Sequence, residues 1–535
     1  MKLSHLLFGL LAGVAFVACT NDDDPAGVTP VNGGDEVAAT KYMAINFVMP
    51  GDATTRAWDD TFEAATGDEI AMADAQILFF DGEGQVADPY TALSDEWSNG
   101  SGSIDKQHAA VIVLKNAIKD PTSVVAILNA PKDQQGNALV TRSTTMTQLK
   151  EMTADFRKNP AANLTMINSV YVNGSDVQFA VPVTSDNIKD SESAALGVPV
   201  KIAVEKVVAK VTLANESGDT DTDQTSNAGK KISVAVNGWW LDSTNPQSYL
   251  VKSLDASYTA FGDWGKWTWN DPTNFRSYWA NSLAMTAPEH FKLADAVQLA
   301  NPIYAHENTD QTKKTELVVA ATLTVEGNTS EDKSLIKFMS DVYTVDDFET
   351  QLYGTISTQY YTRSGDEETG YTYTSVTKDA FTFNYTTGGD LKDYEALVTM
   401  TYNNAETAPL YAYKGTTPVT FTSPSVKVQY WNNGKTYYHI PIIHNSDIVV
   451  NEKTAATEAE DGTEIPATYW GLFGIVRNHL YKVNITGISG LGTPVADTNQ
   501  VIIPVTPPED KETYLAADIV ILKYKVVEQD VNLGE

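Results

Sequence analysis

Residues 42–49 read YMAINFVM, a run in which large apolar residues occupy every second position. Met43, Ile45, Phe47 and Met49 fall on one face of an extended strand, because successive side chains in a strand point to opposite sides. Similar β-branched and aromatic runs recur, bounded by Gly, Asn, Asp and Pro. They cover residues 75–80, 110–114, 124–128, 200–213, 232–236, 317–323, 426–431, 480–485 and 518–527. The sequence therefore predicts an all-β protein.

Helical periodicity is weak and is best at residues 144–159 and 343–352. Strands at this spacing, without long helices between them, favour antiparallel β-sandwiches over α/β units. A chain of 535 residues is expected to contain two or three domains. The polar segment around residues 215–230 separates two strand-rich stretches, so we expect two β domains.

The charge balance excludes one class of partner. The chain has 37 Lys and Arg against 69 Asp and Glu, a formal net charge of -32. Such a chain repels phosphate backbones, so we expect no nucleic-acid partner. Its one cysteine, Cys19, allows neither an intrachain disulfide nor a cysteine zinc site.

The N-terminus predicts export. Lys2 is followed by an apolar run at residues 6–17, which is too short to span a bilayer and is typical of a signal peptide. Cys19 directly follows small and apolar residues, as in a bacterial lipobox, where the cysteine becomes the lipidated first residue. The alternative is an ordinary signal peptide with an incidental cysteine. Residues 20–40 are polar and predict a flexible tether.

No catalytic or cofactor motif is present. The chain has no HExxH, GxSxG or Walker sequence, and the GLG at residues 490–492 lacks the third glycine of a dinucleotide turn. His439, His444 and His479 do not accompany plausible nucleophiles and are interpreted as hydrogen-bonded structural residues. We therefore predict no catalytic site and no cofactor.

One acidic segment resembles the start of a calcium loop. Asp219, Asp221 and Asp223 alternate, but Gln224 and Lys230 stand where an EF-hand requires glycine and glutamate. A solvated linker is the favoured interpretation, so no metal site is predicted.

A tryptophan cluster has two interpretations. Aromatic platforms stack on sugar rings, but large aromatic side chains also fill sandwich cores. We favour the core and keep a glycan-binding platform as the alternative. The cluster consists of Trp239, Trp240, Trp264, Trp267, Trp269 and Trp279.

The two ends of the chain suggest assembly. Residues 51–60 predict a loop, in which a trypsin-like protease can reach the Arg56–Ala57 bond and separate the strand at residues 42–49 from the rest. The C-terminus reads YLAADIVILKYKVVEQDVNL over residues 514–533. Its alternation predicts one shared face, formed by Val520, Leu522, Tyr524 and Val526. A strand from another molecule can fill the groove left by a lost strand, and such a contact propagates.

The sequence resembles the major-subunit fimbrillins of Bacteroidetes, which build type V pili. The resemblance covers most of the chain from Cys19 onward, and its most specific part is the long run from Tyr437 through GLFGIVRNHLYKVNITGISGLGTPV, which ends at residue 495. The C-terminal segment also looks like the donor strands of the short-fimbria shaft subunit. The other matching motifs are KYMAINFVMP at 41–50 before Arg56–Ala57, VEKVVAKVTL at 204–213, GWWLDSTNPQSYLVK at 238–252, FRSYWANS at 275–282 and YAHENT at 304–309.

This resemblance implies a fold of two transthyretin-like antiparallel β-sandwich domains with few short helices. It further implies lipidation at Cys19, cleavage after Arg56 by an arginine-specific protease, and loss of the strand carrying Met43, Ile45, Phe47 and Met49. The implied donor strand carries Val520, Leu522, Tyr524, Val526, Val531 and Leu533. The expected organisation is a signal peptide at 1–18, a removed segment at 19–56, sandwich domains at 57–225 and 226–508, and a donor tail at 509–535.

The expected function is a shaft subunit of a surface fimbria that supports adhesion and biofilm formation. Its partners would be copies of itself, tip and anchor subunits, an arginine-specific or trypsin-like protease, and host or bacterial receptors. The alternative is a monomeric, outer-membrane lipoprotein that binds glycans through the tryptophan cluster. A surface glycosidase is a third interpretation, supported only by the location and the many carboxylates.

Overall fold

The computed structural model describes the chain in separate ranges. Within them strands dominate, and the α-helices are short: α1 (Met146–Glu151), α2 (Glu192–Leu196) and α3 (Val345–Gly354). The prediction of an all-β fold with few short helices is confirmed, and α1 and α3 overlap the two stretches of helical periodicity. The ranges are 41–48, 69, 73–86, 107–114, 121–133, 135–141, 143–157, 163–173, 176–254, 266–268, 274–277, 279–444, 473–505, 515–523 and 527–529.

The N-terminal part of the chain forms a seven-stranded sheet in the order β2-β4-β6-β10-β1-β3, with β9 beside β4. The strands are β1 (Lys41–Val48), β2 (Ala75–Phe80), β3 (Gln107–Leu114), β4 (Ser123–Leu128), β6 (Met166–Asn168), β9 (Val181–Pro182) and β10 (Val200–Lys206). Smaller sheets pair β5 (Thr153–Ala154) with β14 (Ser248–Tyr249), and β7 (Tyr171–Asn173) with β8 (Asp176–Gln178), β15 (Lys266–Thr268) and β16 (Asn274–Ser277).

Both faces of this sheet are covered by apolar side chains. In β2, Ile77 and Phe79 enter one hydrophobic cluster, whereas Leu78 and Phe80 enter a second cluster that includes Leu149 of α1. The alternation follows from the two-residue period of a strand. Because both faces are buried, β2 reads as a continuous apolar run.

The predicted strand at residues 200–213 is two strands in two sheets. β10 ends at Lys206 in the N-terminal sheet, and β11 (Ala209–Asn215) begins a sheet in the middle of the molecule. Val207 and Val208 lie at the crossing and are 0% and 3% exposed. The run of apolar residues is therefore unbroken where the chain passes from one sheet to the other, so the sequence does not reveal the boundary between β10 and β11.

The middle of the molecule is a β-sandwich. One sheet has the order β18-β11-β30-β33-β34 and the other β12-β13-β19-β29-β31, and apolar residues of both sheets form one core. The bounds are β12 (Thr220–Thr225), β13 (Lys231–Asp242), β18 (Ile303–Ala305), β19 (Glu316–Val325), β29 (Lys435–Pro441), β30 (His479–Ile488), β31 (Thr493–Pro494), β33 (Leu515–Lys523) and β34 (Val527–Gln529). A short pair, β17 (Phe291–Lys292) and β32 (Val501–Ile502), lies beside it.

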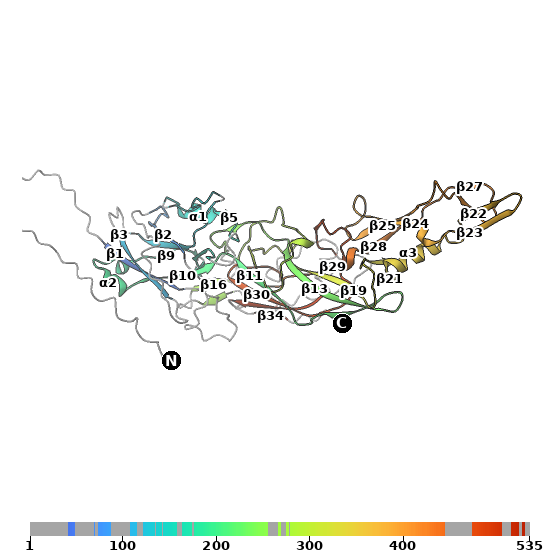
Figure 1. Ribbon diagram of the computed structural model, residues 1–535. Helices are drawn as coiled ribbons and strands as arrows, with labels where there is room; N and C mark the ends of the chain where they lie inside the picture. Colours follow the sequence, from blue (N-terminus) through green and yellow to red (C-terminus); the bar gives the residue numbers. More distant parts are fainter. Residues whose placement is uncertain are drawn as a thin grey trace, which may run out of the picture.

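Residues 335–431 add two further sheets with a core of their own. The first has the order β21-β20-β28-β25-β24, and the second β23-β22-β26-β27. Figure 1 shows an elongated molecule, with the N-terminal sheet at one end and these strands at the other. Their bounds are β20 (Leu335–Phe338), β21 (Asp341–Thr344), β22 (Tyr361–Asp366), β23 (Gly370–Ser375), β24 (Phe381–Thr386), β25 (Glu395–Tyr402), β26 (Leu410–Tyr411), β27 (Pro418–Val419) and β28 (Ser425–Trp431).

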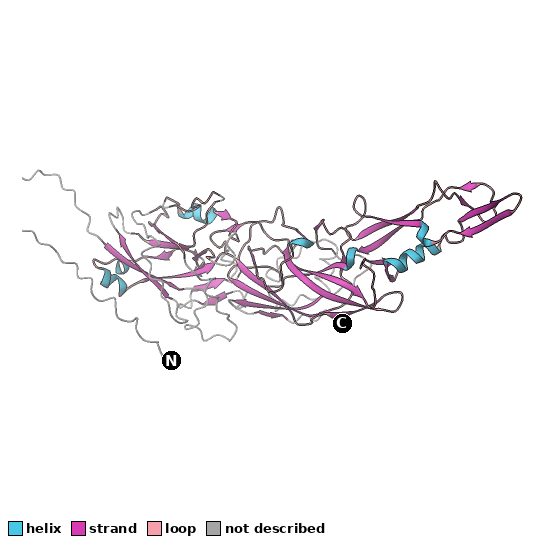
Figure 2. Cartoon of the chain, in the orientation of Figure 1, coloured by secondary structure: helices cyan, strands magenta, loops and turns pink. Residues whose placement is uncertain are grey.

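Among the strands that the structure describes, most pairs are antiparallel, but two are parallel: β1 with β10, and β11 with β30. Figure 2 shows how little helix accompanies these strands.

The α3 helix begins where the Thr344 hydroxyl accepts a hydrogen bond from the Asp347 N–H, which satisfies one of the free donors of the first turn.

Candidate functional site at the N-terminal strand

The β1 strand is hydrogen-bonded on both edges. It runs parallel to β10, with Phe47 opposite Ile202, and antiparallel to β3, with Met43 opposite Ile112. The Tyr42 N–H also donates to the Lys189 carbonyl at 2.8 Å, and the Lys189 N–H donates back at 2.9 Å. Removal of β1 would leave unpaired backbone groups on both β10 and β3.

The apolar face of β1 is fully buried. Met43, Ile45 and Phe47 are each 0% exposed and pack with side chains of β2, β4 and β10. At roughly 1.5–3 kcal/mol for each buried side chain, these three contribute about 5–9 kcal/mol. The predicted sharing of one face is confirmed for these three residues, whereas Met49 lies outside the described residues.

The C-terminal strand lies in a different sheet from β1. β33 pairs antiparallel with β30, with Val520 opposite Lys482 and Leu522 opposite Leu480, and β34 pairs with its other edge. The two elements of the expected assembly, β1 and the tail, are therefore not brought together within one chain. Outside the described residues lie Cys19, Arg56, Ala57, Tyr524, Val526, Val531 and Leu533.

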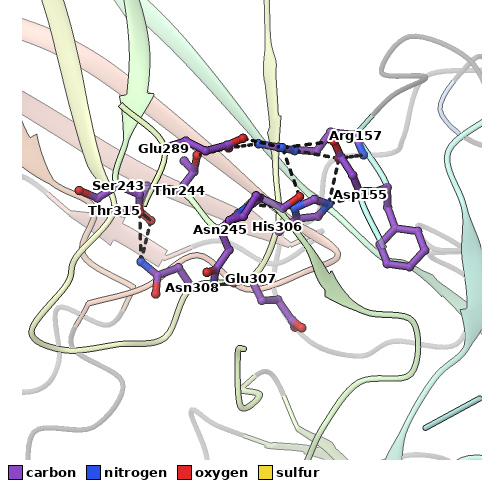
Figure 3. A network of polar contacts seen from close by, with 12 residues as sticks. Asp155, Arg157, Ser243, Thr244, Asn245, Glu289, His306, Glu307, Asn308 and Thr315 are labelled. Atoms are coloured by element: carbon purple, nitrogen blue, oxygen red, sulfur yellow. Dashed lines mark hydrogen bonds and ion pairs between the residues drawn. The ribbon is translucent and has the colours of Figure 1, made fainter. Parts of the chain in front are cut away.

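A polar network that the sequence did not predict links the N-terminal part to the sandwich (Figure 3). Arg157, which follows β5, donates to Asp155 at 3.0 Å and to Glu289 at 3.2 Å. Burial opposes the charge of Arg157, but hydrogen bonds to Glu289 and Asp155 raise its pKa. Glu289 and Arg157 are far apart in the sequence, so no local pattern signals their contact.

His306 lies beside this ion pair and is buried. Its Nε2 accepts a hydrogen bond from the Phe156 N–H at 2.9 Å, so its other nitrogen, Nδ1, carries the proton that is donated to the Asn245 carbonyl at 2.9 Å. Burial, and next the charge of Arg157, lower the pKa of His306 to about 4. The imidazole is therefore neutral at pH 7.

Three of the quoted motifs meet around Arg477, which is fully buried. Its Nη2 lies 2.8 Å from the Glu307 carboxylate, and its guanidinium donates to the Leu250 carbonyl at 2.8 Å and to the Tyr249 carbonyl at 2.7 Å. Asn245 donates in turn to the Glu307 carbonyl at 2.9 Å. The motifs at 238–252, 304–309 and 471–495 thus form one buried polar joint.

A second buried charge cluster surrounds Glu69. Its carboxylate lies 3.7 Å from Lys206 Nζ and 2.5 Å from Lys210 Nζ, and it accepts a hydrogen bond from the Tyr304 hydroxyl at 2.9 Å. Burial lowers the pKa of Lys206 to about 7, although the charge of Glu69 acts in the opposite direction. Burial, together with the like charge of Lys210, therefore outweighs the attraction of Glu69 in setting the pKa of Lys206.

The tryptophan cluster is core where the structure describes its side chains. Trp239, Trp240 and Trp279 are 0%, 2% and 3% exposed, so they offer no open platform for a sugar. The side chains of Trp264, Trp267 and Trp269 lie outside the described residues.

The GLG sequence at residues 490–492 and the acidic segment around Asp221 both have structural roles. Gly492 has φ of +65°, and a Cβ there would lie 2.5 Å from Thr436 Oγ1, so glycine serves close backbone packing. Asp221, in the segment weighed as a calcium loop, accepts from Lys231 at 2.7 Å. Within the described ranges, no group of His, Cys, Asp and Glu could hold a metal ion. No helix in those ranges is long and apolar enough to cross a bilayer.

Residues 429–530 match the family model described as "Major fimbrial subunit protein type IV, Fimbrillin, C-terminal". This region contains the whole of β29 to β34, including the β30–β33 pair. It also contains the run at residues 437–495 that carried the most specific resemblance. No curated protein matches the chain in sequence.

Similar solved structures include a candidate cell adhesion protein from Parabacteroides distasonis, with 14% identity, 90% of this chain and 96% of that chain covered, and a TM-score of 0.38. A fimbrilin (FimA) from Porphyromonas gingivalis has 11% identity, coverage of 91% and 98%, and a TM-score of 0.33. The tip fimbrial protein Mfa3 from Porphyromonas gingivalis, with C-terminal truncation, has 10% identity, coverage of 92% and 100%, and a TM-score of 0.30. The family model, which matches residues 429–530, shows that this C-terminal region is similar to the C-terminal part of the fimbrillins, which are fimbrial subunit proteins.

Proposed function

We propose that this protein is a shaft subunit of a surface fimbria, made as a lipoprotein precursor that is anchored at the outer membrane through Cys19. In this proposal a trypsin-like or arginine-specific protease cuts after Arg56 and releases β1. The observation that carries the proposal is the position of β1, which is paired on both edges and fully buried at Met43, Ile45 and Phe47. A strand held in this way leaves a specific groove when it is lost.

The groove would have a high free energy if it stayed empty. Loss of β1 exposes apolar surface worth roughly 5–9 kcal/mol and the unpaired edges of β10 and β3. An incoming strand with apolar residues at every second position would bury this apolar surface again and would pair the edges of β10 and β3. This requirement makes the groove a site for strand addition.

The proposed donor is the C-terminal tail of the next subunit. Val520 and Leu522 repeat the two-residue spacing of Met43, Ile45 and Phe47, so the tail can present the same number of side chains per unit length. Because donor and groove lie on different sheets of one chain, the contact is heterologous and extends into a filament. Tip and anchor subunits, and receptors on host or bacterial surfaces, are the other proposed partners.

The test is the N-terminal residue of the surface protein, measured by mass spectrometry, together with an unboiled gel. We expect Ala57 at the N-terminus and a ladder that heating dissociates. Arg56→Ala should give an uncut precursor with acylated Cys19 and no ladder, whereas Arg56→Lys separates an arginine-specific protease from one that also accepts lysine.

Deletion of residues 514–535 tests the donor separately. Cleavage at Arg56 should persist, while the ladder and the filaments seen by electron microscopy should disappear. Filaments of normal length from the deleted chain would contradict the donor role. A single monomeric band from the intact chain, with acylated Cys19, would instead favour a monomeric lipoprotein.

A further inference from the structure

Five tyrosines and one arginine gather on one face of the sheet formed by β22, β23, β26 and β27. In the register of this sheet, Arg363 lies opposite Tyr373, and Tyr361 lies opposite Tyr411. Directly opposite residues point to the same side of a sheet. We call this face the tyrosine face; it consists of Tyr361, Arg363, Tyr371, Tyr373 and Tyr411, with Tyr413 against its edge.

Arg363 is held between two rings of this face. Its guanidinium carbon lies 4.1 Å from the ring centre of Tyr371 and 4.3 Å from that of Tyr411. One of its N–H groups donates to the Thr416 carbonyl at 3.1 Å. Among the residues that the structure describes, no carboxylate forms an ion pair with Arg363. Its planar fork therefore keeps donors for an external anion.

Tyr413 supplies the open part of the face. Tyr413 is 60% exposed, and its ring centre lies 5.1 Å from the ring centre of Tyr361 and 6.1 Å from that of Tyr373. Neighbouring rings thus hold Tyr413 while leaving much of it accessible. The opposite face of the same hairpin carries small hydroxyl residues, among them Thr362, Ser364, Thr372 and Thr374. The aromatic character is confined to one face.

The charge and shape of the tyrosine face select a class of ligand. A flat ring with a polar rim accepts the apolar C–H face of a sugar, and an arginine fork matches a carboxylate with two parallel hydrogen bonds. The turn between β22 and β23 carries Glu367 and Glu368, which would disfavour a ligand with several negative charges. A sugar that carries one carboxylate fits both a guanidinium that has no carboxylate partner among the described residues and the two acidic residues of the turn.

We propose that the tyrosine face binds a saccharide that carries a single carboxylate, with the sugar stacked on Tyr413 and the carboxylate paired with Arg363. Figures 1 and 2 place β22, β23 and β27 at the end of the molecule opposite β1. The site is therefore separate from the proposed assembly groove. It would give a fimbrial subunit a means of attachment along its own surface, and it does not depend on how subunits join.

The test uses the purified full chain and saturation-transfer NMR with methyl β-D-glucuronide and the methyl glycoside of N-acetylneuraminic acid. The carboxyl-reduced form of each serves as the neutral comparison. At least one acid should bind, and its neutral form should bind roughly tenfold more weakly, as expected for the loss of a charged hydrogen bond. Equal binding of acid and neutral forms, or no binding of either acid, would overturn the proposal.

Variants locate the binding. Tyr413→Ser is exposed enough to leave the fold intact, and Arg363→Gln removes the charge; each should weaken binding by roughly tenfold. Thr374→Ala on the opposite face is the matched control and should bind as the parent does. If Tyr413→Ser binds normally, or changes only the self-association of the chain in sedimentation, the tyrosine face is not the sugar site.

Discussion

The backbone N–H of Phe156 donates a hydrogen bond to the Nε2 of His306 at 2.9 Å, where the N-terminal part of the chain contacts the sandwich. A ring nitrogen that accepts a hydrogen bond cannot also carry a proton. This contact therefore requires a neutral imidazole, and its contribution to the stability of the fold depends on pH.

The first prediction concerns acid. The pKa of His306 in the folded chain is about 4, below its ordinary value of 6.5, so the unfolded chain takes up this proton first. The contribution of His306 to stability is complete above pH 6.5 and is lost as the pH falls toward 4. The loss should reach about 3 kcal/mol, at about 1.4 kcal/mol per pH unit. Urea unfolding at several pH values measures it.

His306→Gln provides the comparison for this prediction. Glutamine can still accept from the Phe156 N–H but does not titrate, so its unfolding free energy should fall less between pH 6.5 and 4. Parallel curves for the parent and the variant would show that other groups cause the acid sensitivity.

The second prediction concerns the buried pair of Arg477 and Glu307. Arg477→Met leaves the Glu307 carboxylate buried without its cation, which should cost about 3–5 kcal/mol in the free energy of unfolding. Lys231→Ala removes a pair with Asp221 whose side chains are 67% and 51% exposed, and should have no measurable effect. Chemical denaturation compares the two variants, and similar losses would contradict the distinction.

The third prediction separates precursor from filament. Phe47→Ala creates a cavity in the N-terminal core and should lower the stability of the uncut precursor by about 3–5 kcal/mol. If β1 is released on maturation, filaments that do assemble should dissociate at the same temperature as parent filaments. Val198→Ala, at a site 40% exposed, is the control for the precursor. Weakened filaments would mean that β1 stays in the mature subunit.

The fourth prediction uses two glycines with similar backbone angles. Gly388 has φ of +80° and no heavy atom within 4 Å of where a Cβ would stand, whereas Gly492 has φ of +65° and Thr436 Oγ1 at 2.5 Å from that point. Gly388→Ala should cost about 1–2 kcal/mol for the left-handed backbone alone. Gly492→Ala should cost about 1–3 kcal/mol more, because the methyl group overlaps packed atoms. Thermal unfolding of both variants checks the difference.

Local pattern predicted some of these features well. The alternation of Met43, Ile45 and Phe47 correctly placed three residues on one buried face, because the two-residue period of a strand is a property of the backbone itself. The apolar run at 200–213 predicted one strand, whereas the chain forms two strands in two sheets there. Val207 and Val208 are buried at the passage between two sheets, so burial continues while the pairing partners change.

The sequence by itself determined the all-β class and the apolar face of β1, which depend on residue type and short spacing, and its single cysteine excludes an intrachain disulfide. Tertiary structure alone decided that Arg157 meets Glu289, that Arg477 meets Glu307, and that tyrosines from two other strands enclose Arg363. These contacts join residues that lie far apart in the chain or in different strands. They depend on sheet order and register, which fix the positions of side chains that no local period relates.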